Sequence, residues 1–199
     1  MRCYINRDAM TLFDKNIITI AEIESGMLDI VSSKINFLDI LLKIKEELYY
    51  LLMHKKTNLQ IKIECRDFIY QDREKLYLIL LNLISNAVEF SPLDSKVIVN
   101  ISETKEGIKL VVKDFGEGID IVEQENIFKQ FYQAHSGMNR AHVEGQGLGL
   151  SVVDGLIELL GGKMEFESKL LDYSIFEVTL PKLFNSEDNF FDDIAFYQV

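Results

Sequence analysis

The stretch that most constrains the fold is LYLILLNLISNAVEFSP, at residues 76–92. Asn82 and Asn86 are four residues apart, so they are neighbours on one face of the helix that this stretch predicts. A carboxamide is costly to bury without a partner, so two stacked asparagines beside a core face indicate that they hold something polar. Taken alone, the stretch is more often an ordinary amphipathic helix. Its apolar residues recur at helical spacing: Leu76, Leu80, Leu83, Ile84, Ala87 and Val88.

Composition narrows the class of protein. The chain has 199 residues, of which 48% are hydrophobic and 27% charged, as is typical of a soluble globular protein. Its net charge of −11 argues against nucleic acid as a partner, but not against a nucleotide, which needs only local donors and a metal. Cys3 and Cys65 lack metal-ligand spacing, and the apolar run at 38–53 is interrupted by charges. With no signal-peptide core at the N-terminus, we expect a cytoplasmic protein.

The remaining patterns predict a two-layer α/β domain, an α+β sandwich in which a mixed sheet is covered by helices on one face. Asn36 and Asp72 are expected to cap helices. The segment from 115 to 149 is loop-like, and a long loop in a compact domain is usually functional. Besides the organising stretch, helices are expected over 8–24, 36–54 and 150–160, and strands over 58–65, 68–70, 96–102, 108–114, 163–168 and 174–180.

Two glycine motifs flank the loop-like segment. Asp114-Phe-Gly116-Glu-Gly118-Ile119 directly follows a predicted strand, where a carboxylate can accept a hydrogen bond from an exocyclic amine and the glycines let a flat ring approach. On its own this motif is as often a turn with a surface aspartate. Gly145-Gln-Gly147-Leu-Gly149-Leu150 leads into the last helix, whose N-terminus would suit a polyphosphate. It matches neither the dinucleotide fingerprint nor the Walker loop, and a glycine hinge without a ligand stays open.

Taken together and in this order, the motifs resemble the ATP-binding domain of sensor histidine kinases, in the GHKL (Bergerat) superfamily. The resemblance covers residues 10–183, including a closing segment at 176–181. Four boxes of the family are matched: N-L-I-S-N-A at 82–87 is similar to the N box, D-F-G-E-G-I at 114–119 to the G1 box, I-F-K-Q-F at 127–131 to the F box, and G-Q-G-L-G-L at 145–150 to the G2 box.

The resemblance implies ATP and Mg²⁺ as cofactors and assigns roles to single residues. Asn86 would be the Mg²⁺ ligand, with Asn82 supporting the same site, and Asp114 would read the adenine amino group. A lid at about 121–146 would close over the phosphates. Phosphoryl transfer needs positioning and charge neutralisation, and one carboxamide with phosphate oxygens is a reasonable Mg²⁺ shell. The other residues implied to bind ATP are Gly116, Gly118, Ile119, Arg140, Gly145, Gly147, Leu148, Gly149 and Leu150.

The chain departs from the family at one charged position. Many members carry a lysine or arginine three residues after the metal-binding asparagine, where this chain has Glu89. A carboxylate there would repel a triphosphate unless it points away or acts through the metal. Arg140 and Lys129 are candidate replacements, of which Lys129 reads better as an ordinary surface cation.

A second departure is the acceptor. None of His54, His135 and His142 lies in the H-E/D-x-x-T/N-P setting of the phosphoacceptor, and the helix at 8–24 resembles only the second helix of the family's dimerisation hairpin. We therefore expect residues 1–27 to be the remnant of that hairpin, 28–184 the ATP-binding domain and 185–199 an acidic tail. The chain would be a truncated kinase, a split-gene product or a kinase acting in trans. The expected partners are a histidine-bearing dimerisation domain, in another chain or a missing segment, a second copy bound through 8–24, and a response regulator by resemblance.

Two other functions compete with the histidine kinase. Hydrolases of the same superfold, such as gyrase, Hsp90 and MutL, carry a glutamate base four residues before the metal-binding asparagine. That position is Asn82 here, which argues against activation of water. A degenerate, non-catalytic pseudo-kinase or interaction module stays open because of Glu89 and the missing acceptor. The favoured prediction is a protein-histidine kinase core that is incomplete without an acceptor domain, whose parent could be membrane-anchored.

Overall fold

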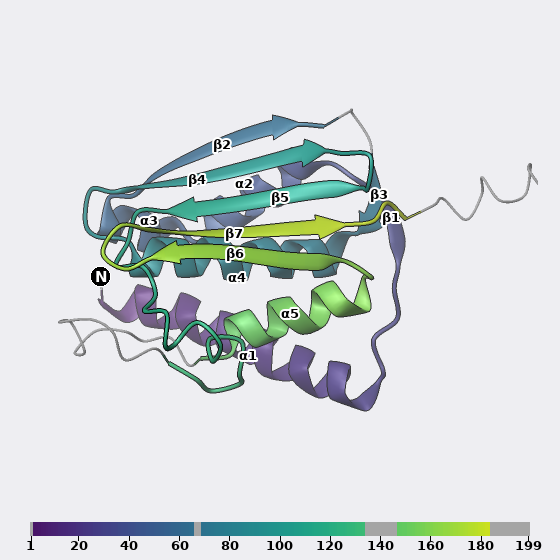
Figure 1. Cartoon of the computed structure of the whole chain (residues 1–199), viewed down its shortest axis with the longest axis horizontal. Coiled ribbons are helices and arrows are strands. Elements are labelled where there is room, and N and C mark those ends of the chain that lie inside the picture. The colour runs from purple at the N-terminus through teal and green to yellow at the C-terminus, as the bar shows by residue number, and fades with distance from the viewer. Residues whose placement is uncertain (1, 66–68, 134–146, 184–199) are drawn as a thin grey trace, which may run out of the picture.

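A five-stranded mixed sheet forms one layer of the domain, in the order β2-β4-β5-β7-β6. The computed structural model describes residues 2–65, 69–133 and 147–183, with side chains from residue 12 onward. Along the chain (Figure 1), the elements are α1 Arg2–Ser25, β1 Ser32–Ile35, α2 Phe37–Glu47, α3 Tyr49–Lys55, β2 Asn58–Glu64, β3 Ile69–Asp72, α4 Arg73–Phe90, β4 Lys96–Glu103, β5 Ile108–Asp114, α5 Gly149–Leu159, β6 Lys163–Lys169 and β7 Tyr173–Leu180.

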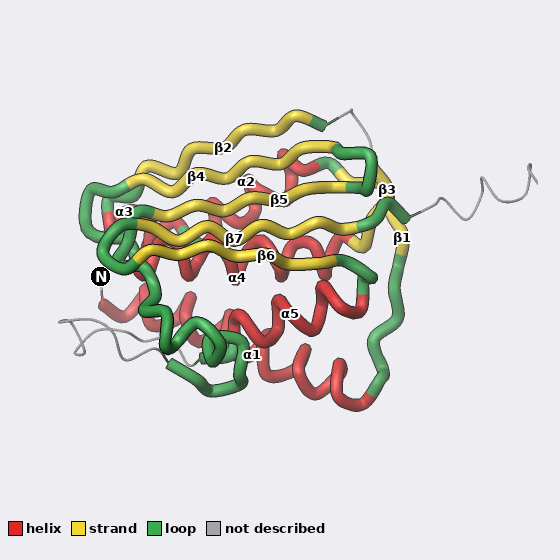
Figure 2. Tube along the Cα trace, in the orientation of Figure 1, coloured by secondary structure: helices red, strands yellow, loops and turns green. Residues whose placement is uncertain are grey.

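The sheet is covered by helices on one face, as the alternating strands predict. The edge strand β2 pairs with β4 in parallel, and the other neighbours pair antiparallel. Along β4, Val97, Val99 and Ile101 are fully buried, whereas Ile98 and Asn100 lie on the opposite, open face. Figure 2 shows the red helices gathered on one side of the yellow strands. The expected two-layer α/β fold is therefore confirmed.

Helix α4 is the centre of the core, and its beginning is fixed by a cap. The Asp72 carboxylate accepts hydrogen bonds from the backbone amides of Glu74 and Lys75, at 3.1 Å each, as the sequence predicts. From this start α4 runs beneath the sheet and contacts β4, β5, α2 and α5. Apolar side chains on almost every side of it are buried, because α4 lies between the sheet and other helices.

The single helix expected over 36–54 is wrong in one respect: the chain forms two helices that meet at Leu48. Asn36 does cap the first, accepting from the Leu38 amide at 2.9 Å. The break turns the chain so that Leu48 and Leu52 both stay in the core. Leu38 and Leu42, expected on the apolar face, are exposed instead. The packing of Leu48 and Leu52 in the core therefore determines where the helix breaks, and the helical periodicity of the sequence does not show this break.

The short strand β1 is missed by the sequence patterns. It pairs with β3, in a separate two-stranded antiparallel sheet. Next to it, the Lys75 ammonium donates to the Asp72 carboxylate at 2.7 Å and to the Asp29 carbonyl at 2.6 Å. The Val31 amide donates to the same carboxylate at 2.8 Å. These bonds anchor the segment between α1 and β1 to the domain.

Helix α1 packs on the same side of the sheet, against α5 and α3. The sequence predicts that this helix docks through a stripe containing Phe13, Ile17 and Ile20. In the structure it turns Asn16 and Thr19 inward, and Ile17 stays 43% exposed. The docking is confirmed, but the buried face is more polar than expected. Among the helices of the described residues, none has the length and apolarity needed to cross a membrane.

Candidate nucleotide-binding site

The start of α5 lies directly against the two asparagines of α4. A Cβ added at Gly149 would lie 2.9 Å from Asn82 Oδ1 and 3.6 Å from Asn86 Nδ2. A side chain at this position would therefore occupy the space beside both carboxamides. Two segments more than sixty residues apart thus form one polar face, made of two amides and a helix N-terminus. That face suits phosphate oxygens and a hard cation.

The two asparagines differ in accessibility. Asn82 is 1% exposed, and its amide donates to the Leu78 carbonyl at 2.9 Å. Its amide and oxygen also form a reciprocal pair with Asn16 of α1, at 2.9 and 2.8 Å. Asn86 is only half-buried. Asn86 is therefore the better placed of the two to reach a bound metal. Asn16 was not identified by the sequence patterns, because it is 66 residues from its partner.

Asp114 lies at the end of β5 and is 4% exposed. Burial raises the pKa of its carboxyl to about 6, and this rise is opposed by hydrogen bonds from backbone amides, including that of Gly116 at 2.9 Å. The group is thus mainly ionised at neutral pH, and backbone amides donate to it. A buried carboxylate of this kind gains most from an additional donor, such as an exocyclic amine.

The glycines of the 114–119 motif seat its turn in the fold. A Cβ at Gly116 would lie 2.3 Å from the carbonyl oxygen of Phe90, at the end of α4. Gly118 has φ +62°, and its Cβ would lie 2.1 Å from the Lys169 carbonyl oxygen in the β6–β7 hairpin. The Ile119 amide donates to Ser168 Oγ at 2.8 Å. Both glycines are needed for close backbone packing, in addition to the ring approach that the family resemblance implies.

The described part of the 145–150 motif, residues 147–150, leads directly into α5. Leu148 is buried, and its carbonyl accepts from Ser151 Oγ at 2.8 Å. Leu150 packs partly buried against the core. Gly147 has φ +69°, and a Cβ there would lie 2.4 Å from the Tyr132 carbonyl oxygen. The backbone at Gly147 therefore packs closely against the residue that follows the F box. The remaining predicted residues of this region, Arg140 and Gly145, and two of the histidines, His135 and His142, lie outside the described residues.

The F-box segment at 127–131 packs against the sheet. Ile127 is buried, and the Phe128 ring packs edge-on against Phe166, with ring centroids 5.6 Å apart. Phe131 is 68% exposed. Lys129 donates to Asn126 Oδ1 at 2.6 Å within its own turn, which agrees with its interpretation as a surface cation.

A cation that the sequence patterns missed lies at the C-terminal end of α4. Lys55 of α3 donates to the carbonyls of Glu89 and Ser91, at 2.5 and 2.9 Å. Burial lowers the pKa of its ammonium, and the carboxylates of Glu89 and Glu117 oppose that shift. The unusual acidic residue at 89 therefore has a lysine beside it. No local signal could identify Lys55, because it comes from a different helix 34 residues earlier.

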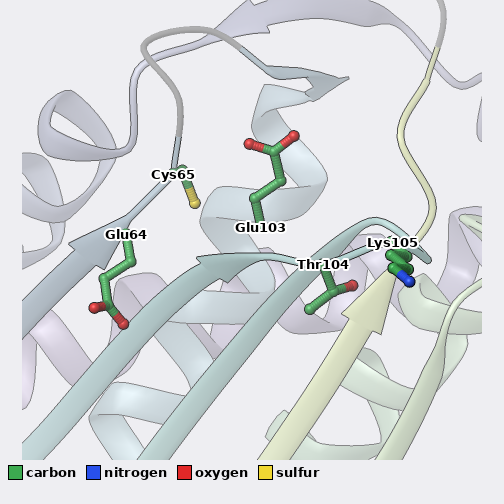
Figure 3. Close-up of a pocket in the computed structure, with 5 residues that line it drawn as sticks. All are labelled: Glu64, Cys65, Glu103, Thr104 and Lys105. Carbon is green, nitrogen blue, oxygen red and sulfur yellow. The ribbon is translucent and has the colours of Figure 1, made fainter.

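A separate hollow lies at the other end of the sheet (Figure 3) and does not suit a nucleotide. Its lining comes from the ends of β2 and β4 and the turn after β4. Burial and the neighbouring Glu103 raise the pKa of the Cys65 thiol, so the thiol stays protonated. Two of the lining residues are acidic, which disfavours a triphosphate. The residues that line the hollow are Glu64, Cys65, Glu103, Thr104 and Lys105.

Comparison with known proteins identifies relatives by sequence. The family model described as "Histidine kinase-, DNA gyrase B-, and HSP90-like ATPase" matches residues 71–183. The autoinducer 2 sensor kinase/phosphatase LuxQ of Vibrio vulnificus is 33% identical over 176 residues, 83% of this chain and 20% of LuxQ. The sensor histidine kinase YcbM of Bacillus subtilis is 28% identical over 167 residues, 82% of this chain and 53% of YcbM. The chain thus spans between a fifth and about half of these relatives.

Solved structures share the fold. The histidine kinase AdeS of Acinetobacter baumannii superposes with a TM-score of 0.69 at 22% identity, covering 84% of this chain and 75% of AdeS. The catalytic domain of the histidine kinase ThkA gives a TM-score of 0.65 at 21% identity, covering 78% of this chain and 97% of that domain. The chain belongs to the family of histidine kinase-, DNA gyrase B- and HSP90-like ATPases, and its domain is of the sensor histidine kinase ATP-binding type.

Proposed function

We propose that this chain is the Mg-ATP-binding catalytic core of a two-component histidine kinase, transferring the γ-phosphoryl group to a histidine other than its own three. The observation that carries the proposal is the meeting of α4 and α5, where Asn82 and Asn86 lie against Gly149. The turn holding the buried Asp114 packs on Phe90, one helical turn beyond Asn86. An adenine end and a phosphate end thus lie along one helix.

The donor set fits a magnesium ion held mainly by the nucleotide. Within the described residues, no group of three or more histidine, cysteine or acidic side chains could hold a metal. Mg²⁺ commonly takes one or two protein oxygens, and its other ligands are phosphate oxygens and waters. The half-buried Asn86 would supply one such oxygen, with Asn82 beside it. When bound, the ion would neutralise charge on the phosphates.

The residues would act by positioning. The Asp114 carboxylate would accept a hydrogen bond from the adenine amino group, which fixes the base. The amides at the start of α5 would face the phosphates, with a glycine at 149 to admit them. Lys55 offsets the negative charge of Glu89 at the end of α4. These roles suffice for phosphoryl transfer, whose catalysis is mostly alignment and charge stabilisation.

The partners follow from the same proposal. The phosphoryl group would pass to a histidine-bearing dimerisation domain and then to a response regulator, in the cytoplasm. Of the three histidines, His54 lies in the last turn of α3, and it is not part of the polar face that Asn82, Asn86 and the start of α5 form. A second copy would bind through residues 8–24, where Ile17 and Ile18 are exposed on the outer face of α1.

Titration with ATP, with and without Mg²⁺, tests the proposal. Asn86→Ala should abolish the gain in affinity that Mg²⁺ gives, and Asp114→Asn should weaken binding at least tenfold, since a buried charged acceptor is worth roughly 1.5–3 kcal/mol. The matched controls are Asn100→Ala, on the open face of β4, and the exposed Asp94→Asn. Both controls should bind as the parent does. A parent chain that binds no Mg-ATP would overturn the kinase function and favour a degenerate module.

Transfer itself separates a kinase from a binding module. The full chain is incubated with γ-labelled ATP and a histidine-bearing dimerisation domain from a related kinase. Acid-labile label on that domain, lost in Asn86→Ala, is the expected result. Release of free phosphate without labelling would instead indicate a hydrolase, which the asparagine at position 82 disfavours.

A further inference from the structure

Helix α1 places one side chain in the middle of the candidate site. Asn16 is 5% exposed and forms two reciprocal amide hydrogen bonds with Asn82, at 2.8 and 2.9 Å. Asn82 also donates to the Leu78 carbonyl, so both of its N–H groups and its oxygen are engaged inside the protein. While α1 is docked, the Asn16 amide takes one lone pair of the Asn82 carboxamide oxygen and holds that carboxamide turned toward α1.

Other contacts of α1 reach four parts of the domain. Lys15 pairs with Glu47 of α2 at 2.6 Å and approaches the Tyr77 hydroxyl of α4 at 3.4 Å. Ile23 lies on α5, where its Cδ1 is 3.0 Å from the place a Cβ would take on Gly155. Glu24 accepts from Gln130, in the F-box segment at 127–131, at 3.0 Å. Figure 1 shows α1 lying alongside α5, on the face away from the sheet. Helix α1 therefore contacts both α4, which carries the two asparagines, and the F-box segment.

The contacts between α1 and the domain fix the position of α1 more than they stabilise its docking. Its buried centre contains Asn16 and Thr19, and the Lys15–Glu47 pair at its edge is partly exposed. An amide pair contributes little net free energy over water, but it is lost completely when the two partners shift. Partly exposed ion pairs contribute up to about 1 kcal/mol. Separation of α1 from the domain thus costs far less than unfolding of the sheet and α4.

We infer that α1 is a releasable cover of the nucleotide site, held by the Asn16–Asn82 pair. Docked α1 keeps the Asn82 carboxamide turned toward Asn16, and release of α1 frees it for the metal- and phosphate-binding face. This inference rests on the proposed function, since it assumes that Mg-ATP uses this face. By linkage, Mg-ATP and docked α1 weaken each other to the same extent, so movement of α1 controls nucleotide affinity.

Release of the cover is tested by Asn16→Ala and Ile23→Ala in the full chain, with the exposed Asp14→Ala as the matched control on α1. Amide hydrogen exchange reports docking of α1, and calorimetry reports Mg-ATP affinity. Both test variants should exchange faster over residues 12–25 and bind Mg-ATP about threefold to tenfold more tightly, the equivalent of one net hydrogen bond. Asp14→Ala should change neither quantity. The Ile23 variant leaves the Asn16–Asn82 atoms intact, so it separates docking from the loss of a polar partner.

Locking the cover gives the opposite change. In a Cys3→Ser/Cys65→Ser background, Ile23→Cys and Gly155→Cys place two thiols where side-chain atoms of residue 23 already lie 3.0–3.9 Å from the Gly155 Cβ position. The oxidised protein should bind Mg-ATP at least threefold more weakly, and reduction should restore the affinity. Equal affinity in the locked and reduced proteins, with the released variants unchanged, would overturn the cover. Absence of binding in every variant is a different result, which overturns the proposed function and the cover with it.

Discussion

Under the proposed function, the ionisation of Asp114 would control the adenine end of the candidate site. Its pKa of about 6 means that only about a tenth of the carboxyl is ionised at pH 5, and the protonated form is a poor acceptor for an amine. We expect affinity for adenosine, which carries no titrating phosphate, to fall about tenfold between pH 7 and pH 5. Calorimetry or equilibrium dialysis across this range measures the change. Asp114→Asn should bind weakly at every pH, and a parent affinity without pH dependence would contradict the assignment.

Single residues were predictable where the signal is local. Asn82 and Asn86 lie on adjacent turns of one helix, and Asp114 lies at the end of a strand, so local patterns make each of them a candidate, and the order of the motifs along the chain suggests their roles. Asn16 and Lys55 reach the same region from separate helices, 66 and 34 residues away, and no local pattern carries such a contact. Gly116 and Gly118 were predicted to make room for a flat ring, but the structure shows that they are also needed for close backbone packing. Close backbone approach at Gly116 and Gly118 is visible only once the neighbouring elements are in place.

The turn that follows β5, at 115–119, depends on backbone contact with the β6–β7 hairpin. Gly26 and Gly118 both have positive φ, but a Cβ at Gly26 would meet nothing within 4 Å, whereas one at Gly118 would lie 2.1 Å from the Lys169 carbonyl oxygen. Gly26→Ala should therefore cost about 1 kcal/mol, the cost of the backbone conformation alone. Gly118→Ala should cost about 3 kcal/mol or more, because backbone must move. Urea unfolding measures both, and equal losses would show that the contact is relieved cheaply.

The junction of β3 and α4 is stabilised by a buried charge pair. Desolvation raises the pKa of Asp72, but the hydrogen bonds from Lys75 and the Val31 amide outweigh it and hold the pKa below its ordinary value. A carboxyl whose pKa is lowered by folding stabilises the fold above its unfolded pKa, and that contribution is lost as the pH falls through the folded pKa. Stability should thus drop steadily below about pH 4. Urea unfolding at pH 3 to 7 tests this expectation.

Replacement of Asp72 removes both the helix cap and the partner of Lys75. Asp72→Ala should cost about 3–5 kcal/mol at pH 7, since a buried ammonium remains without a counterion, and the stability of this variant should no longer share the acid-dependent loss. The exposed Asp154→Ala on α5 is the control and should change stability by less than about 0.5 kcal/mol. A small loss for Asp72→Ala would mean that Lys75 finds another partner or reaches water.

At the scale of the whole molecule, the sequence predicts the two layers of the fold but not the order of the strands within the sheet. The sequence predicts every strand of the described residues except β1, and the alternation is clear in the five-stranded sheet because one of its faces is buried and the other is open. It does not show that β2 joins β4 in parallel, or that β7 lies between β5 and β6, since these pairings depend on long-range contacts. The strand β1 escaped because its four residues, SSKI, have no alternation to detect. The position of α1 also depends on long-range contacts, such as the pair between Asn16 and Asn82.

The molecule should therefore open in two steps, with α1 leaving before the core unfolds. The core helix α4 is held by apolar burial on almost every side, whereas α1 is held by an amide pair, a partly exposed ion pair and a few apolar contacts. Hydrogen exchange measured at increasing urea should give α1 an opening free energy several kcal/mol below that of α4. Asn16→Ala should lower the value for α1 alone, and Ile157→Ala, in the core, should lower both. A single opening free energy for the two helices would show that α1 is an inseparable part of the domain, and no cover could then be released.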